Sequence, residues 1–363
     1  MKLVVFGLTV SSSWGNGHAT LWRGLFRALG ELGHRAIFFE RDVPYYAAHR
    51  DLVEVPGCDL RLYSSWAAVL AQAQRELADA DVGMVTSYCP DGIAASELVL
   101  STPAVLHAFY DLDTPVTLHK LRSGQRVDYI PDRGLGDFDL VLSYTGGIAL
   151  DLLRSELGAR HVEPLYGSVD PVVHRPVEPR YEYDLSYLGT YSSDRQSGLD
   201  SLFLEPARKM RRRRFLIGGA QYPGDFPWSE NIWYIPHVPP PHHPPFYCSS
   251  SLTLNVTRAA MAQMGFCPSG RLFEAAACAV PVLSDSWQGL GAFFEPGREI
   301  LVAESTAEAV DAIGADPKEL AQMGRAARAR VLSQHTAQHR ARELVGILNA
   351  PVGGVRVAAR ASS

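Results

Sequence analysis

A short stretch in the last third of the chain combines a helix start with residues that bind phosphate. Pro268, Ser269 and Gly270 interrupt the preceding pattern and place a hydroxyl side chain at a position suited to an N-cap. The first amides of a helix favour an anion, and Arg271 adds a guanidinium that fits phosphate oxygens. Glu274 follows one turn later, where a carboxylate can accept hydrogen bonds from a ribose diol. The stretch predicts a nucleotide-sugar site; the alternative is an ordinary i,i+3 surface pair of Arg271 and Glu274.

A glycine loop near the N-terminus is a second candidate. Gly15, Asn16, Gly17 and His18 follow an apolar strand pattern and precede a helical one. Their spacing is not G-x-G-x-x-G, so a dinucleotide cofactor is not indicated. Contact with a ligand and capping of the helix start are the two roles open to His18.

Two aspartates follow a buried strand pattern ending at Tyr110. Ligands bind at such strand ends in open α/β sheets, so Asp111 is a candidate to accept a proton or hold sugar hydroxyls. For Asp111 an Asx turn is an equal alternative, and for Asp113 a turn closed by Thr114-Pro115 is the favoured role. A metal at Asp-x-Asp is not favoured, because the helix-based phosphate site neutralises charge without a cation.

The stretch 255–303 resembles the donor-binding half of retaining GT-B glycosyltransferases, in particular the CgeB-like (spore maturation protein) family. The motifs occur in the family's order: Leu-Asn-Val-Thr-Arg up to Arg258, Pro-Ser-Gly-Arg-Leu-Phe-Glu up to Glu274, and Phe-Glu-Pro-Gly-Arg-Glu from Phe294. The resemblance implies two Rossmann-like domains facing across a cleft, and retaining, metal-independent transfer from a nucleotide-diphosphate sugar. One departure is Phe266, which stands where related enzymes carry a glutamate that contacts the donor sugar.

The same resemblance implies that the N-terminal loop faces the cleft, where its amides and His18 would meet donor phosphates or an acceptor. It also implies further donor-binding positions. They are Gly189, Thr190, Arg195, His237, Val238 and Arg258. Arg195 would reach the diphosphate, and the backbone at His237 and Val238 would contact the base; surface roles remain the alternatives for Arg195 and Arg258. The neighbouring pair His242-His243 is a poor metal site without acidic or cysteine partners nearby, so no metal and no cofactor other than the co-substrate is expected.

Composition limits the class of protein. The chain has 363 residues, 47% of them hydrophobic, and a net charge of −5, which fits a two-domain globular enzyme and argues against general nucleic-acid binding. The basic run Arg211–Arg214 fits a solvated helix end, although a contact with a membrane surface or an acidic acceptor is left open. Five scattered cysteines indicate neither disulfides nor zinc, and no apolar stretch approaches the roughly 20 residues of a membrane span, so a cytoplasmic location is expected.

Strand-like and helix-like patterns alternate twice along the chain, which is typical of parallel α/β folds. The first series predicts strands near 2–8, 35–41, 82–88, 103–110 and 140–145, with a helix at 19–32. The second predicts strands near 185–189, 214–218, 232–236, 252–256, 281–284 and 300–303, then helices at 317–331 and 334–348. We therefore expect an acceptor-side domain at 1–170, a donor domain at 180–333, a helix crossing back at 334–349 and a disordered tail at 350–363, with a hinge at 167–179.

Together these patterns predict a glycosyltransferase with UDP-sugar as the preferred donor and a glycan, lipid or small molecule as acceptor. His18, Asp111, Arg271 and Glu274 are the candidate catalytic residues. A nucleotide-sugar epimerase of the same fold and a non-catalytic carbohydrate-binding or surface-assembly protein are the alternatives, and Phe266 keeps the second of them open. The oligomeric state is not indicated by the sequence.

Overall fold

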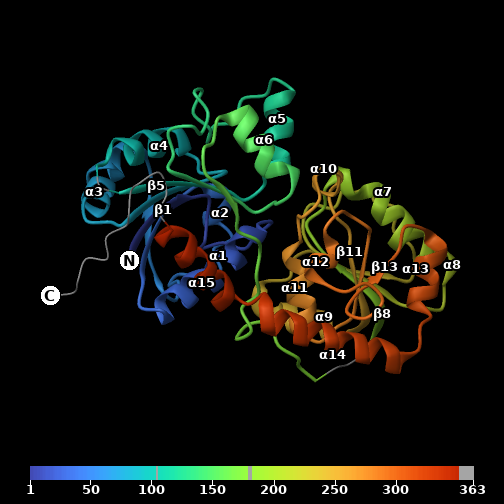
Figure 1. Cartoon of the computed structure of the whole chain (residues 1–363). Helices are drawn as coiled ribbons and strands as arrows, with labels where there is room; N and C mark the ends of the chain where they lie inside the picture. Colours follow the sequence, from blue (N-terminus) through green and yellow to red (C-terminus); the bar gives the residue numbers. More distant parts are fainter. Residues whose placement is uncertain (104, 179–181, 351–363) are drawn as a thin grey trace. The chain divides into compact units, whose positions relative to one another are not determined.

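The computed structural model describes residues 1–103, 105–178 and 182–350, and the chain divides into two compact units. Unit 1 consists of Met1–Tyr166 together with helix α15 (Ala337–Asn349), and unit 2 of Gly167–Thr336. Each unit contains one parallel β-sheet with packed helices (Figure 1). The expected α/β class is confirmed.

The sheet of unit 1 has the strand order β3-β2-β1-β4-β5-β6-β7, and all neighbouring strands are parallel. The strands are β1 (Lys2–Gly7), β2 (Arg35–Arg41), β3 (Cys58–Tyr63), β4 (Val82–Thr86), β5 (Leu106–Asp111), β6 (Leu140–Ser143) and β7 (Val162–Pro164). The central strands are mostly apolar, because a parallel sheet is covered by helices on both faces. All of β1 after Lys2 is buried.

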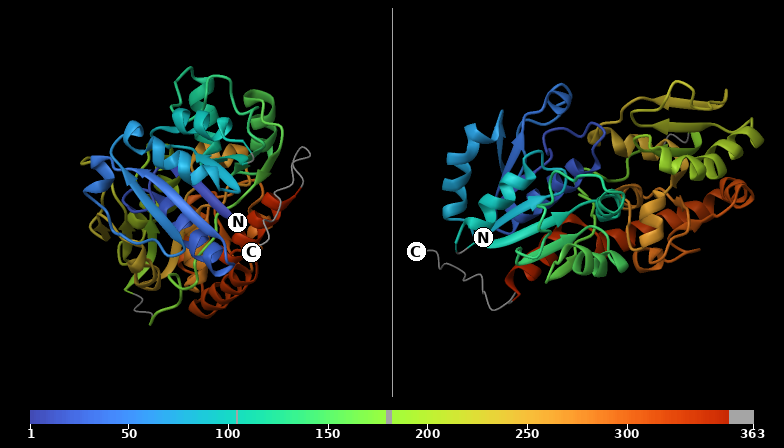
Figure 2. Two further views of the ribbon diagram at one scale, coloured as in Figure 1. Left: turned by 90° about the vertical axis from the view of Figure 1, so that its left-hand side faces the viewer. Right: turned by 90° about the horizontal axis from the view of Figure 1, so that it is seen from above.

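Helix α15 completes the core of unit 1, although it lies far along the sequence. Its buried residues recur at helical spacing, at Ala337, Ala341, Leu344 and Leu348, and they join the same core as the apolar face of α1 (Gly17–Glu31). Figure 2 shows this red C-terminal helix beside the blue N-terminal segment. The other helices of unit 1 are α2 (Pro44–Ala47), α3 (Trp66–Ala78), α4 (Gly92–Ser101), α5 (Thr114–Arg122) and α6 (Ile148–Leu157).

The sheet of unit 2 is also parallel, with the strand order β10-β9-β8-β11-β12-β13. Its strands are β8 (Tyr183–Leu188), β9 (Phe215–Gly218), β10 (Ile232–Ile235), β11 (Ser250–Asn255), β12 (Val282–Ser284) and β13 (Leu301–Val302). Its α-helices are α7 (Gln196–Leu199), α8 (Glu205–Lys209), α9 (His243–Cys248), α10 (Ala259–Met264), α11 (Gly270–Ala277), α12 (Leu290–Phe293), α13 (Thr306–Ile313) and α14 (Pro317–Gln334). Three short turns of other helix types complete the unit: Ser193–Arg195, Asp200–Leu204 and Pro240–His242.

The sequence patterns located every strand of unit 2 and missed two strands of unit 1. Strand β3 alternates apolar and charged residues, as expected of an edge strand that is only half buried, and β7 has three residues. The first helix begins at Gly17 and not at residue 19. Residue 104, in a predicted strand, and residues 351–363, in the predicted tail, lie outside the described residues.

Candidate functional site

The predicted donor residues lie in the sheet of unit 2 at the point where the strand order changes direction. Strand β8 lies between β9 and β11, so the loops after β8 and β11 diverge at the carboxyl edge of the sheet. Such switch points are where open α/β sheets bind ligands. Gly189 and Thr190 follow β8, while Arg258 and helix α11 follow β11.

Helix α11 begins as the sequence predicted, with Ser269 at the N-cap and Gly270 as the first helical residue. The Ser269 side chain makes no capping hydrogen bond. A Cβ atom added at Gly270 would have a single heavy atom within 4 Å, Oε1 of Glu274 at 3.9 Å. The helix start therefore has room for a ligand group, and the orphan amides of a first helical turn are donors for an anion.

Arg271 is buried, which the sequence did not indicate. Its Nε donates to the carbonyl of Leu188, its Nη1 donates to Oδ1 of Asn255 at 2.7 Å, and its guanidinium carbon lies 4.7 Å from the ring centre of Tyr187. The remaining nitrogen, Nη2, lies beside Gly189, where an added Cβ would be only 2.7 Å away. The cation is thus fixed beneath the turn after β8, and the alternative of a surface pair with Glu274 is wrong.

Glu274 is nearly buried on the second turn of α11 and contacts two histidines and a tyrosine. Its Oε2 accepts from the Tyr247 hydroxyl at 3.1 Å and lies 3.3 Å from Nδ1 of His243, and its Oε1 lies 3.9 Å from Nε2 of His174. Burial alone would raise the pKa of Glu274, but the two histidines and the tyrosine outweigh it and hold the pKa at about 2. Glu274 is therefore a carboxylate at neutral pH.

The fold gives His243 the acidic neighbour that the sequence does not show. The sequence places no acidic partner near His243 and so predicts a poor metal ligand, but the folded chain brings Glu274 and His174 next to it. Among the described residues, these three form the group whose side-chain atoms, all within 4.8 Å of one another, could hold a metal ion. Neither His174 nor Tyr247 was singled out from the sequence, because no spacing rule links residues so far apart in the chain.

The other predicted donor residues lie around the same sheet edge. Nη1 of Arg195 donates to the carbonyl of Thr190 at 3.2 Å, which places this cation at the turn after β8. Arg258 donates from Nε to Asp194 at 2.7 Å, so its charge is neutralised by the residue preceding Arg195. His237 and Val238 follow β10, and the Val238 carbonyl accepts from His243 at 3.1 Å.

Phe266 adopts a backbone conformation that is unusual for a bulky residue. Its φ is 45°, in the left-handed region, and its amide donates to the Gln288 carbonyl at 2.7 Å. Its ring packs on Gly289, where an added Cβ would lie 2.6 Å from it. The aromatic side chain is thus accommodated by a glycine across the loop.

The N-terminal loop of unit 1 is organised by a carboxylate that the sequence analysis missed. Glu40 at the end of β2 is 1% exposed. It accepts from the Thr9 hydroxyl, the Val10 amide, and both the amide and the hydroxyl of Ser11, at 2.5–3.0 Å. An acidic residue directly after four apolar strand residues was the available signal, since a carboxylate enters a sheet only where donors meet it.

His18 lies further along this loop and does not cap helix α1. Asn16 is the cap, because its side chain accepts from the His18 amide at 3.1 Å, and Gly15 supplies a left-handed turn with φ of 60°. The His18 ring lies 5.8 Å from the Tyr88 ring, centre to centre. Burial lowers the pKa of His18, although the charge of Asp113 acts in the opposite direction. The imidazole is neutral at physiological pH, with its Nδ1 lacking a hydrogen-bond partner among the described residues.

The Asx turn that the sequence favours for Asp113 is made by Asp111, the last residue of β5, for which the sequence gives that turn as an equal alternative. Asp111 closes the Asx turn: its Oδ1 accepts from the Asp113 amide at 3.0 Å and from the Thr117 hydroxyl at 3.1 Å. Asp113 instead accepts from the Tyr88 hydroxyl at 2.7 Å. Asp111 is fully buried, and burial raises its pKa to about 6 against the opposing effect of these hydrogen bonds. Asp111 can therefore exchange a proton near neutral pH.

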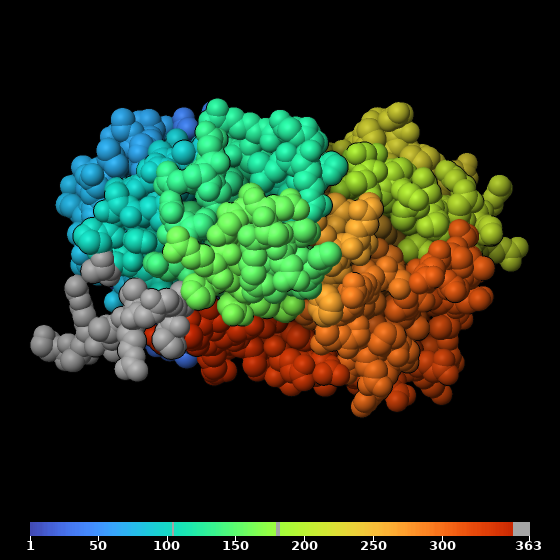
Figure 3. All heavy atoms as spheres, turned by 45° about the horizontal axis from the view of Figure 1, so that its top comes forward, coloured from blue at the N-terminus to red at the C-terminus, as the bar shows by residue number. Residues whose placement is uncertain are grey.

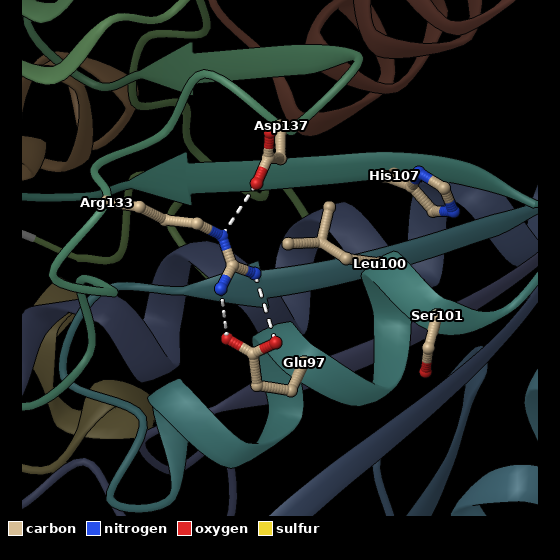
Figure 4. Close-up of a pocket in the computed structure, with 6 residues that line it drawn as sticks. All are labelled: Glu97, Leu100, Ser101, His107, Arg133 and Asp137. Atoms are coloured by element: carbon tan, nitrogen blue, oxygen red, sulfur yellow. Dashed lines mark hydrogen bonds and ion pairs between the residues drawn. The ribbon is translucent and has the colours of Figure 1, made fainter.

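A surface pocket of unit 1 lies away from Asp111 and Asp113. Glu97, Leu100, Ser101, His107, Arg133 and Asp137 line it (Figure 4). Arg133 is already paired with Glu97 at 2.8 Å and with Asp137 at 2.6 Å. His107 lies near the amino end of β5, whereas Asp111 ends that strand, so this pocket is at the opposite edge of the sheet.

The basic run Arg211–Arg214 is exposed beside the edge strand β10 of unit 2. Arg213 pairs with Asp184 at 2.7 Å, and the Arg214 guanidinium carbon lies 4.7 Å from the ring centre of Trp233. In Figure 3 the olive-coloured segment that contains this run forms part of the outer surface of unit 2. Within residues 1–103, 105–178 and 182–350, no helix has both the length and the apolar character that crossing a membrane requires.

Comparison with known proteins gives the enzyme class. Residues 195–346 match the family described as glycosyl transferase-like. The chain carries a glycosyltransferase domain. None of the curated proteins matches its sequence.

Solved structures show the fold of the whole chain. Sucrose-phosphate synthase from Thermosynechococcus elongatus is 13% identical, with a TM-score of 0.69 over 96% of this chain and 98% of that one. Anabaena Alr3699/HepE in complex with UDP-glucose is 11% identical, with a TM-score of 0.68 over 96% and 99%. An alpha-glucosyltransferase in complex with UDP and a 13-mer DNA is 11% identical, with a TM-score of 0.65 over the same shares. Two Rossmann-like units of this kind make the GT-B architecture.

Proposed function

We propose that this glycosyltransferase takes its sugar from a nucleoside-diphosphate sugar that binds at the carboxyl edge of the unit 2 sheet. The main support for this proposal is the open position above Gly270. A helix N-terminus and the Glu274 carboxylate border it, and the turn after β8, next along that sheet edge, holds the Arg271 cation. A diphosphate needs positive charge and amide donors, and a ribose needs an acceptor for its hydroxyls. UDP is the proposed nucleotide, since solved structures of the same fold are complexes with UDP or UDP-glucose.

The proposed chemistry is electrostatic. When the bond to the sugar breaks, negative charge grows on the diphosphate, and fixed donors stabilise it without having to reorganise. Arg271, Arg195 and the amides at Ser269 and Gly270 would supply this stabilisation, so we propose that transfer needs no divalent cation. Retention of the anomeric configuration, and membership of the CgeB-like branch, rest on the resemblance of the donor motif.

Unit 1 supplies the candidates for the acceptor side. His18 and Asp111 are proposed to meet the sugar or the acceptor: a neutral imidazole can accept a proton, and Asp111 has a pKa of about 6. The acceptor stays open among a glycan, a lipid and a small molecule.

A ligand screen tests the proposal. Calorimetric titration with UDP, GDP, dTDP, CDP and ADP, each with magnesium and with EDTA, should give selective binding of one nucleotide that EDTA does not abolish. Turnover of the matching nucleotide sugar should fall roughly 100-fold in Arg195→Ala, but not in Arg325→Ala at an exposed control position. Binding of none of the nucleotides would refute the proposal. Conversion of the nucleotide sugar without any acceptor would indicate an epimerase, and proton NMR of the product would decide between retention and inversion.

A further inference from the structure

The carboxylate of Glu274 is held by side chains from two other segments of unit 2. His243 opens helix α9, Tyr247 lies one turn later on the same helix, and His174 lies near the start of the unit. The His174 side chain is fully buried, and those of His243 and Glu274 are each 12% exposed. Two segments outside helix α11 thus converge on one carboxylate.

His243 lies between the Val238 carbonyl and Glu274. Its Nε2 lies 3.1 Å from the Val238 carbonyl, which can only accept, so Nε2 carries a hydrogen. Its Nδ1 lies 3.3 Å from Oε2 of Glu274, within ion-pair distance. The ring, fixed at Nε2, therefore holds the Oε2 side of the carboxylate in place.

His174 supports this arrangement from behind. Its Nε2 lies 3.3 Å from Nδ1 of His243. Burial lowers the pKa of His174, against the effect of the Glu274 charge, so this second ring stays neutral and adds no repulsive positive charge. The nearby acidic group Asp170 also acts on His174, in the same direction as Glu274.

The two oxygens of Glu274 are consequently not equivalent. Oε2 accepts from the Tyr247 hydroxyl and lies against Nδ1 of the His243 ring. Among the described residues, the ion-pair neighbour of Oε1 is His174 at 3.9 Å, and Oε1 borders the open position above Gly270. We infer that His243, backed by His174, is a positioning residue that turns Oε1 of Glu274 toward the ribose diol of the donor nucleotide. This inference rests on the proposed function.

The test compares nucleotides that differ by one hydroxyl. Calorimetric titration of the full chain with UDP, 2′-deoxy-UDP and 3′-deoxy-UDP should show at least tenfold weaker binding of one deoxy analogue to the wild type, because a hydrogen bond to a charged group is lost. His243→Ala should lower this ratio below about threefold, chiefly by weakening UDP. His243→Asn should restore most of it, because its amide nitrogen takes the place of Nδ1. The neighbouring exposed residue gives the matched control, His242→Ala, which should keep the full ratio.

The outcomes separate the inference from the proposed function. Full discrimination in a folded His243→Ala variant, judged by circular dichroism, would overturn the inference and leave the proposed function standing. Binding of UDP by the wild type without discrimination would refute the ribose role of Glu274 and the inference with it. Stoichiometric zinc in the purified protein that is lost in His243→Ala would also overturn it, because the cluster would then be a metal site. Failure to bind any nucleotide would remove the proposed function itself.

Discussion

Asp111→Asn is expected to change the pH dependence of stability more than any surface substitution. The carboxyl is fully buried in unit 1, where Oδ1 accepts from the Asp113 amide and the Thr117 hydroxyl. Its Oδ2 has no hydrogen-bond partner among the described residues. Asparagine keeps the accepting oxygen and has nearly the same shape, so the substitution removes the titration and little else.

The sign and the size of the effect on stability follow from the pKa shift of Asp111. Burial raises the pKa of Asp111 from 3.8 to about 6, so folding favours the protonated form. The stabilising contribution is complete below about pH 3.8 and is lost as the pH rises through about 6. A difference of about two pKa units corresponds to about 3 kcal/mol. Against this, the buried amide of asparagine lacks one partner, at a cost of about 1–2 kcal/mol. At pH 8 the variant should therefore be about 1–2 kcal/mol more stable than the wild type, and at pH 4.5 it should be less stable.

The assay is urea unfolding from pH 4.5 to 8, followed by circular dichroism and tryptophan fluorescence, at pH values where the two signals coincide. Asp132→Asn, at an exposed position, is the control and should run parallel to the wild type. Parallel curves for Asp111→Asn and the wild type across this range would refute the reasoning. The same variant tests the predicted catalytic role, since turnover should fall although stability at pH 8 rises.

Three further outcomes are expected. Gly189→Ala should weaken donor binding and lower stability by about 1–3 kcal/mol, because the new Cβ would lie 2.7 Å from Nη2 of Arg271; unchanged nucleotide affinity by calorimetry would argue against a donor role for this turn. Arg271→Lys should cost about 2–3 kcal/mol in urea unfolding as well as activity, since an ammonium cannot replace the fork of donors, and a variant of wild-type stability would contradict the hydrogen bonds described. Glu40→Gln should cost about 2–3 kcal/mol, because an amide group would face donors, whereas the exposed control Glu54→Gln should cost less than about 0.5 kcal/mol.

The sequence was sufficient for features that depend on neighbours along the chain. The apolar runs predicted the strands of both sheets except β3 and β7 of unit 1, since a strand buried on both faces is largely apolar. Pro268 and Ser269 predicted the start of α11, because a proline and an N-cap residue act on the next few residues only. These local rules gave the α/β class and the position of the helix start.

Contacts between remote segments could not be derived in the same way. The partners of Glu274 come from residues 100 and 31 positions away, His174 and His243, and no periodicity connects them. The sequence left Arg271 as either a phosphate-binding cation or a member of a surface pair with Glu274, and only packing under the turn at Gly189 shows that it is buried.

The sequence by itself thus determined most of the strands and where helix α11 begins, because hydrogen bonding and burial within an element are set by local residue types. Tertiary structure alone decided that Glu40 organises the N-terminal loop, that burial raises the pKa of Asp111, and that Tyr247 and His243 contact the same oxygen of Glu274. The physical reason is that the charge and direction of a buried polar group depend on the donors that the fold brings to it, and these donors come from distant parts of the chain.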